Sequence, residues 1–142
     1  MTAIDLDTSD YGAPFWAGCA RGELLVQQCA GCDQRIFPPE PACPGCLASG
    51  LEWVGSRGTG TVYSFSVVYR SPGPDFPVPY ALAVIDMDDG WSLLSNVVAD
   101  DATGPGFERL RSGARVRAEF TSKPGGHGQM PVFRLVPTGA CP

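Results

Sequence analysis

Two C-x-x-C pairs constrain the fold of this chain more than any other feature of its sequence. The four residues are Cys29, Cys32, Cys43 and Cys46. Each pair lets one tight turn aim two sulfurs at a single point, and two such pairs close together in sequence are typical of one tetrahedral metal site. We expect Gly31 and Gly45, inside the pairs, to supply the backbone freedom that these turns need.

Four thiolates complete a tetrahedral shell and leave no position for water or substrate, so the pattern predicts one structural zinc ion. Iron in a rubredoxin-like site would use the same ligands, and two disulfides would suit a secreted chain. Because the sequence starts with no recognisable signal peptide, cytoplasmic zinc is the simpler interpretation. Cys19 and Cys141 lie outside the pairs, and we expect a partly buried apolar residue and a tail thiol with no chemical role.

Composition limits the classes of partner. The chain has 142 residues, a net charge of -5 and 44% hydrophobic residues. It contains no apolar run near the roughly 20 residues of a membrane helix, so we expect a soluble protein without a membrane partner. The acidic balance argues against nonspecific binding to nucleic acid, which depends on neutralising phosphates.

Basic and titratable residues give little support for catalysis. Four of the nine arginines fall within residues 109–117, where they could bind a small anion or pair with Glu108 and Glu119 in a solvated segment. The single histidine, His127, lies in a glycine-rich turn, and no second histidine can build a Ser-His or Cys-His arrangement. The sequence therefore predicts no autonomous acid–base catalyst.

The N-terminal half suggests a short helix and a ribbon. Asp10 can cap a helix that carries Phe15 and Trp16, a large apolar surface that must pack against this protein or a partner. Strands are expected at 24–26, 36–37 and 52–54, with Trp53 covering the ribbon core. Phe37, Pro38 and Pro39 lie in a proline-rich segment between the cysteine pairs, which is either a rigid spacer or an apolar contact carried on a metal-fixed loop.

The C-terminal half has the pattern of a small β-barrel. Residues rich in β-branched and aromatic types predict strands at 61–69, 80–87, 91–98, 115–121 and 131–136. Five short strands with one longer break fit a Greek-key barrel of the OB type, which removes exposed sheet edges. The loop at 71–79 holds Phe76 among four prolines and is a candidate contact surface.

The predicted fold is therefore mainly β: a short N-terminal helix, a rubredoxin-like zinc ribbon and a C-terminal five-stranded OB-fold barrel. The corresponding division of the chain is 1–23 for the N-terminal segment and helix, 24–56 for the ribbon, 57–137 for the barrel and 138–142 for the tail.

Several short motifs, taken in order, resemble the DUF35 family of zinc-ribbon OB-fold proteins over residues 11–137. Besides the cysteine pairs they are Phe15-Trp16, Gly22-Glu23-Leu24, Phe37-Pro38-Pro39, Gly58-Thr59-Gly60-Thr61-Val62-Tyr63-Ser64 and Pro131-Val132-Phe133. Each motif alone is weak, and their ordered combination carries the resemblance. By this resemblance the four cysteines match the family's zinc ligands.

The resemblance implies a noncatalytic partner of a thiolase-like or lipid-transfer-like protein, with acyl-CoA at the shared interface. The reaction would be acyl transfer, thiolysis or retro-aldol cleavage of a steroid side-chain acyl-CoA, and the partner would carry the catalytic residues. The contacts to the partner or to acyl-CoA would come from Phe15, Trp16, Phe37, Pro38, Pro39 and Phe76.

One residue departs from the family pattern. Glu40 stands where many relatives have arginine, which weakens the case for direct contact with CoA phosphates. The alternative function is binding of single-stranded nucleic acid, because four-cysteine ribbons and OB barrels both occur in such proteins.

Overall fold

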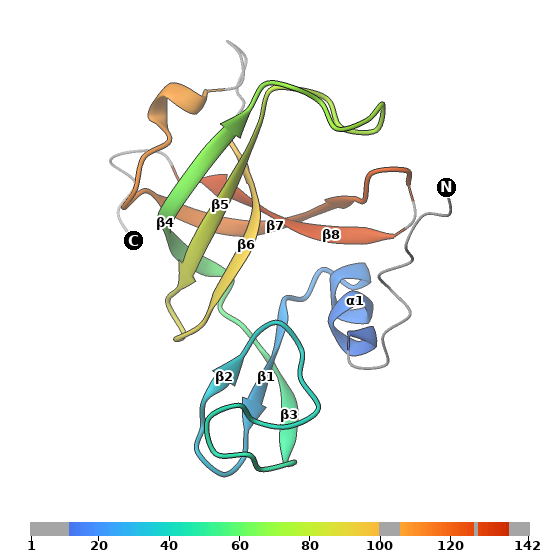
Figure 1. Cartoon of the computed structure of the whole chain (residues 1–142), viewed down its shortest axis with the longest axis vertical. Coiled ribbons are helices and arrows are strands. Elements are labelled where there is room, and N and C mark those ends of the chain that lie inside the picture. Colours follow the sequence, from blue (N-terminus) through green and yellow to red (C-terminus); the bar gives the residue numbers. More distant parts are fainter. Residues whose placement is uncertain (1–11, 100–105, 127, 137–142) are drawn as a thin grey trace.

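The structure is a computed structural model that describes residues 12–99, 106–126 and 128–136 (Figure 1). Asp10, His127 and Cys141 lie outside these ranges. The elements in chain order are helix α1 (Ala13–Ala20), strands β1 (Leu25–Cys29), β2 (Arg35–Ile36), β3 (Leu51–Gly55), β4 (Thr59–Val68), β5 (Tyr80–Met87) and β6 (Ser92–Val98), the 3-10 helix η2 (Phe107–Arg109), and strands β7 (Arg115–Ser122) and β8 (Gln129–Leu135). Within the described ranges, no helix has the length and apolar composition needed to cross a membrane.

Helix α1 begins at Ala13, and its N-cap residue is Gly12, which makes no side-chain cap hydrogen bond. Asp10, the cap that the sequence suggested, lies outside the described residues. The helix ends in a Schellman motif. The N–H of Gly22 donates to the carbonyl of Cys19, and the N–H of Glu23 donates to that of Gly18. Gly22 adopts a φ of 76°, a left-handed conformation that glycine enters without steric cost.

The ribbon is a three-stranded antiparallel sheet in the order β2-β1-β3. Its strands overlap the predicted ones, although β2 ends at Ile36, so that Phe37 begins the following loop. Helix α1 packs on this sheet, and a Cβ at Gly18 would lie 2.9 Å from the Leu25 side chain. Glycine at position 18 therefore permits the close approach of helix and strand.

The barrel closes in the order β4-β5-β6-β8-β7, with β6 and β8 parallel and the other neighbours antiparallel. This is the five-stranded OB arrangement predicted from the sequence. The observed β5 coincides with its predicted range, and the other four strands lie within two residues of theirs at each end. Figure 1 shows the ribbon at one end of the barrel, with α1 lying beside both.

One apolar core joins the three parts of the chain. It includes Phe15 and Cys19 of α1, Val26 of the ribbon, and Ile85 and Phe133 of the barrel. Because the core is shared, the structure does not separate the helix, the ribbon and the barrel, and the division of the chain at residues 23, 56 and 137 stays a prediction. The ribbon has only a small cluster of its own, formed by residues 29, 36 and 43 with two partly buried neighbours.

Trp53 packs against the shared core and not against the small ribbon cluster, contrary to the sequence-based expectation. Strand β3 leads directly into the barrel, which places the indole at the junction. Cys19 is 1% exposed, and burial raises the pKa of its thiol to about 11, so it serves as a small apolar core residue as expected.

One arginine of the arginine-rich stretch pairs with an acid other than the two expected. Arg115 donates two hydrogen bonds to the carboxylate of Asp88, at 2.7 and 2.6 Å. These bonds, together with one from Thr59, hold the pKa of the Asp88 carboxyl well below its usual range. Glu119 pairs with Arg134 of the neighbouring strand β8. Arg115 thus ties β7 to the turn between β5 and β6.

An ion pair fixes the ribbon to the barrel. Arg35 of β2 donates to Asp89 in the β5–β6 turn at 2.8 Å, and the Asp89 side chain is only 8% exposed. The same carboxylate accepts hydrogen bonds from the backbone N–H of Arg57 and the indole N–H of Trp91. Asp89 thus bonds to the ribbon, the linker and the barrel.

Replacing Asp89 with alanine should lower the free energy of unfolding by about 2–4 kcal/mol, because three donors lose their acceptor and Arg35 is left largely buried without its partner. Urea denaturation measures this. Glu23→Ala breaks the exposed Arg21–Glu23 pair and is the matched control, expected to cost less than about 1 kcal/mol. Equal losses of stability in both variants would contradict the role of Asp89 in joining the ribbon, the linker and the barrel.

Candidate metal centre and apolar pocket

The four cysteines of the two pairs converge at one end of the ribbon. Their sulfur atoms all lie within 4.8 Å of one another. The Sγ atoms of Cys29 and Cys46 are 3.5 Å apart, and those of Cys32 and Cys43 are 3.6 Å apart. A tetrahedron with Zn–S bonds of about 2.3 Å has edges of about 3.8 Å, so the cluster fits a single metal ion.

The two turns have the same internal geometry. In the first, the N–H of Asp33 donates to the carbonyl of Cys29, and in the second, that of Leu47 donates to the carbonyl of Cys43, at 2.9 and 2.8 Å. Asp33 and Leu47 both adopt positive φ, of 62° and 65°. The left-handed residue therefore comes directly after each C-x-x-C pair. We had expected the backbone freedom to be needed inside the pairs, at Gly31 and Gly45, and neither glycine has a positive φ.

In each turn, backbone N–H groups favour the thiolate of the first cysteine. Those of Cys32 and Gly31 lower the pKa of the Cys29 thiol, and those of Cys46 and Gly45 lower that of Cys43, to about 7. Cys29 and Cys43 are buried, whereas Cys32 and Cys46 are exposed. Metals bind cysteine as thiolate, so this arrangement suits a metal centre with one buried and one exposed ligand from each turn.

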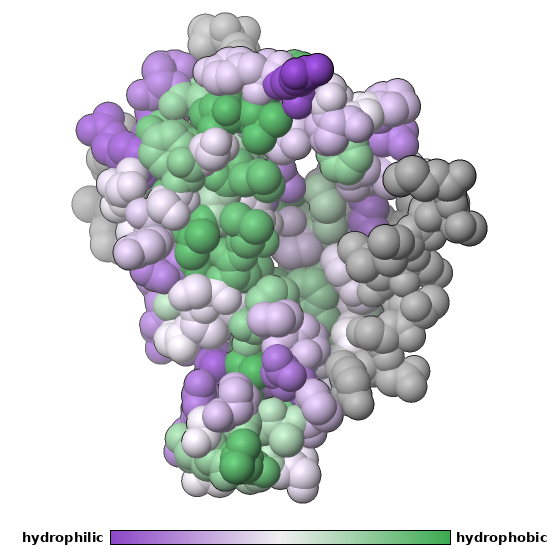
Figure 2. All heavy atoms as spheres, in the orientation of Figure 1, coloured by the Kyte–Doolittle hydropathy of each residue, from purple (hydrophilic) through white to green (hydrophobic). Residues whose placement is uncertain are grey.

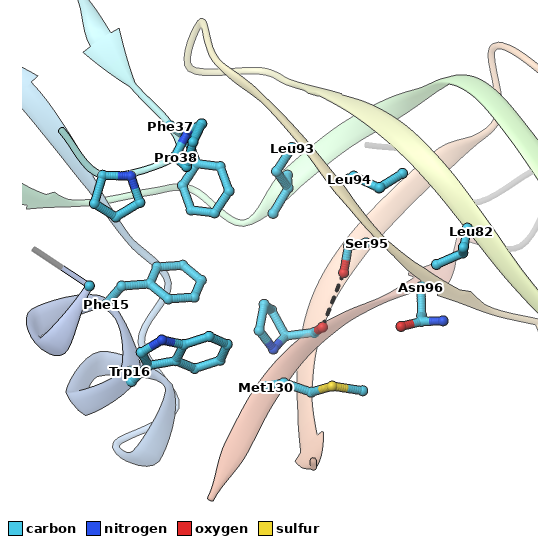
Figure 3. Close-up of a pocket in the computed structure, with 13 residues that line it drawn as sticks. Phe15, Trp16, Phe37, Pro38, Leu82, Leu93, Leu94, Ser95, Asn96 and Met130 are labelled. Atoms are coloured by element: carbon cyan, nitrogen blue, oxygen red, sulfur yellow. Dashed lines mark hydrogen bonds between the residues drawn. The ribbon is translucent and has the colours of Figure 1, made fainter. Parts of the chain in front are cut away.

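An apolar pocket of about 600 Å³ lies where the helix, the ribbon and the barrel meet (Figure 3). This size falls within the range of about 300–1,000 Å³ that is usual for small-molecule sites. The pocket is lined by Gly12, Phe15, Trp16, Phe37, Pro38, Pro39, Leu82, Leu93, Leu94, Ser95, Asn96, Met130 and Pro131.

Three aromatic rings form one side of the pocket. The ring centroid of Phe37 lies 5.3 Å from that of Phe15 and 5.4 Å from that of Trp91, so Phe37 bridges the helix and the barrel. Trp16 meets Phe15 edge to face at 5.0 Å. The ammonium of Lys123 lies over the Trp16 ring, 3.6 Å from its centroid, which holds the indole in place by a cation–π interaction.

A buried glutamine fixes the proline-rich segment that carries Phe37. The Nε2 of Gln27 donates to the carbonyl of Glu40 at 3.1 Å, and its Oε1 accepts from the N–H of Glu40 at 2.8 Å. Gln27 is 6% exposed and is the one buried polar residue among those the structure describes. The side-chain amide thus bonds to both backbone groups of Glu40, as a neighbouring strand would. This pairing holds Phe37, Pro38 and Pro39 at the pocket.

The structure brings together five of the six contact residues predicted from the sequence. Phe15, Trp16, Phe37, Pro38 and Pro39 all line the pocket, although Phe15 is only 4% exposed and belongs mainly to the core. Phe76 lies elsewhere. It is 40% exposed in the loop between β4 and β5, where its ring contacts Tyr80.

Sequence reasoning missed the barrel side of the pocket. Leu82, Leu94 and Asn96 point outward from the barrel, because their neighbours Ala81, Ala83 and Val97 face the core. Leu94 is 65% exposed, and Figure 2 shows apolar side chains gathered on this face of the molecule. A signal was available: Leu93 and Leu94 are adjacent in a strand, so one of them must face outward.

A four-cysteine ribbon joined to a five-stranded OB barrel defines the class of zinc-ribbon OB-fold proteins. Two family models match consecutive parts of this chain: the rubredoxin-like zinc ribbon domain of ChsH2 over residues 16–52, and the C-terminal OB-fold domain of ChsH2 over residues 53–121. The chain belongs to the DUF35/ChsH2 family.

Two curated relatives are described as hydratase subunits. The chain is 38% identical over 123 residues to the probable enoyl-CoA hydratase alpha subunit of Thermomonospora curvata, covering 84% of this chain and 36% of that protein. It is 31% identical over 110 residues to the 3-oxo-4,17-pregnadiene-20-carboxyl-CoA hydratase alpha subunit of Mycobacterium tuberculosis. That alignment covers 78% of this chain and 33% of that protein. The chain spans about a third of the length of these relatives.

Solved structures show the same architecture. A chain of the structure described as the Ltp2-ChsH2(DUF35) aldolase aligns with a TM-score of 0.77 and 28% identity, covering 95% of this chain and 98% of that one. A DUF35-family protein of unknown function from Sulfolobus solfataricus aligns with a TM-score of 0.62 and 18% identity, covering 93% and 90%, a likeness that shows the fold alone.

Replacing Gln27 with methionine should lower the free energy of unfolding by about 1–2 kcal/mol, because both backbone groups of Glu40 lose their partners. Urea denaturation measures the loss. Gln28→Met is the matched control, since Gln28 makes one exposed bond of 3.3 Å and should cost less than about 0.5 kcal/mol. If the two variants were equally stable, Gln27 would not hold the segment.

Proposed function

We propose that this chain is a noncatalytic accessory subunit of a thiolase-fold enzyme complex that acts on acyl-CoA thioesters. The observation that carries this proposal is the full-length likeness to the ChsH2(DUF35) type of chain, combined with a half-open apolar pocket at the junction of helix, ribbon and barrel. The chain would stabilise its thiolase-like or lipid-transfer-like partner and complete the channel that holds acyl-CoA.

The names of the relatives indicate the reaction class. They include a subunit of a hydratase for a pregnadiene carboxyl-CoA and an aldolase complex. We therefore propose that the complex cleaves a steroid side-chain acyl-CoA by a retro-aldol reaction, with acyl transfer or thiolysis as the other reactions that a thiolase-fold partner could perform. A cytoplasmic location would suit such chemistry and would keep the cysteines reduced.

Several features support a noncatalytic role for this chain. Four thiolates would fill the coordination shell of the metal and leave no position at which substrate could bind. The described lining of the pocket contains no charged or titratable side chain to act as acid, base or nucleophile. The partner would therefore supply the catalytic residues, and this chain would supply apolar contacts.

We assign the metal as one structural zinc ion held by Cys29, Cys32, Cys43 and Cys46. The ion would fix the ribbon and both ends of the segment that carries Phe37. Purified protein should contain one zinc per chain by elemental analysis, and Cys43→Ser should lose the metal and lower the melting temperature, because folding of a small ribbon is coupled to metal binding.

Cys141→Ser is the matched control and should keep both the zinc and the melting temperature. Full stability of metal-free protein, or loss of zinc from the control, would contradict the assignment. Iron in place of zinc would retain the ligands but change the ion.

Coexpression with the thiolase-like protein encoded nearest to this chain tests the function. A stoichiometric complex that turns over acyl-CoA only when both chains are present is the expected result. Leu94→Glu should weaken the complex, because it introduces a charge on the exposed rim of the pocket without disturbing the core. Tyr63→Glu, at a position of similar exposure outside the pocket, is the matched control.

Two results would overturn the proposal. Turnover of acyl-CoA by this chain alone would make it an enzyme in its own right. Failure of the two proteins to associate, with zinc still bound, would remove the accessory role while leaving the fold intact.

A further inference from the structure

Leu47 combines two features that do not stabilise the folded chain. Its side chain is 80% exposed, the highest value among the large hydrophobic side chains of the described residues, so it contributes little packing. Its φ is 65°, a left-handed conformation that is unfavourable for a branched apolar residue. An exposed leucine alone is ordinary on a protein surface. An exposed leucine in a strained conformation needs a reason outside its own chain.

The matching position of the first metal turn shows what such a turn needs. Asp33 follows the first C-x-x-C pair as Leu47 follows the second, with a φ of 62°. Both turns close with the same hydrogen bond to the carbonyl of the first cysteine of the pair. Aspartate enters the left-handed region more often than most residues do. The geometry of the turn therefore does not require a leucine at position 47.

The backbone holds Leu47 rigidly at the outer end of the ribbon. The N–H of Leu47 donates to the carbonyl of Cys43 at 2.8 Å, and the N–H of Cys43 donates to that of Ala48 at 2.9 Å. The paired strands β1 and β3 lead into the barrel after Gly55, and the metal turns lie at their other end (Figure 1). A side chain that is fixed before a partner binds loses little entropy on binding.

The segment around Leu47 carries no charged residue. Residues 41–51 contain no Asp, Glu, Lys, Arg or His, although 18% of the chain is charged. Figure 2 shows apolar side chains at this end of the ribbon. The thiolates of a metal centre would add only negative charge, so this segment offers no cation to bind phosphate. Its composition fits an apolar site on a protein and disfavours nucleic acid.

We infer that the outer end of the ribbon is a docking surface for the thiolase-like partner, and that Leu47 inserts into an apolar pocket of that partner. This inference rests on the proposed function and adds a contact outside the apolar pocket of this chain. Leu47 lies in the same β2–β3 connection as Phe37, Pro38 and Pro39, which line the pocket proposed to face the partner. Burial of the leucine in the complex would offset its backbone strain.

Leu47→Asn separates docking from folding, because asparagine enters the left-handed conformation more easily and removes the apolar side chain. The free, zinc-loaded chain should melt about 2–4 °C higher than the wild type, since backbone strain is relieved. Its affinity for the thiolase-like protein should fall at least about tenfold, because the burial of one leucine side chain is lost. Thermal denaturation and calorimetric titration of the purified proteins measure these two effects.

Asp33→Asn is the matched control, since it places the same residue type at the corresponding position of the first turn. Its melting temperature and its affinity for the partner should both stay close to those of the wild type. Leu47→Met keeps an apolar side chain of similar volume and should bind the partner more tightly than Leu47→Asn does. Misfolding cannot produce higher stability together with weaker binding.

A complex of Leu47→Asn as tight as that of the wild type would overturn this inference and leave the proposed function intact. So would a lower melting temperature of the free variant, because the leucine would then stabilise its own chain. Self-association of the wild type in analytical ultracentrifugation, abolished in Leu47→Asn, would make a second copy the occupant instead. If the wild type does not bind the thiolase-like protein, the proposed function fails and this inference fails with it.

Discussion

Contacts of the Phe37 side chain hold together the parts of this molecule that form its pocket. The ring lies between Phe15 of the helix and Trp91 of the barrel, with centroid distances of 5.3 and 5.4 Å. It can do so because Gln27 fixes the backbone of Glu40 three residues later. Together with the shared core and the Arg35–Asp89 ion pair, this aromatic contact joins the helix, the ribbon and the barrel.

The metal centre and the pocket are linked through the chain. The segment that carries Phe37, Pro38 and Pro39 lies between Cys32 and Cys43, so an ion bound to both would close it into a loop of fixed ends. Fixing a loop before binding reduces the entropy that is lost when a ligand or partner orders it. The structural ion would in this way support binding although it contacts no substrate.

Local sequence patterns predicted the elements of the fold better than their contacts. The strand at 80–87 and the four-cysteine cluster follow from periodicity and spacing, which are local properties. The left-handed residues Asp33 and Leu47 were missed, because leucine does not signal that conformation and aspartate only enters it more often than most residues do. Leu94 and Asn96 were missed because their outward orientation depends on strand register, and the place of Trp53 depends on how the ribbon meets the barrel. The strand order came from the family resemblance and not from the pattern.

Hydrogen–deuterium exchange of the chain with and without its thiolase-like partner tests the central claim most directly, namely that the pocket at the junction of helix, ribbon and barrel faces the partner. The account predicts that protection on complex formation is concentrated in α1, in the segment after β2 and in β6. Protection confined to the far side of the barrel, or spread evenly over the chain, would contradict it.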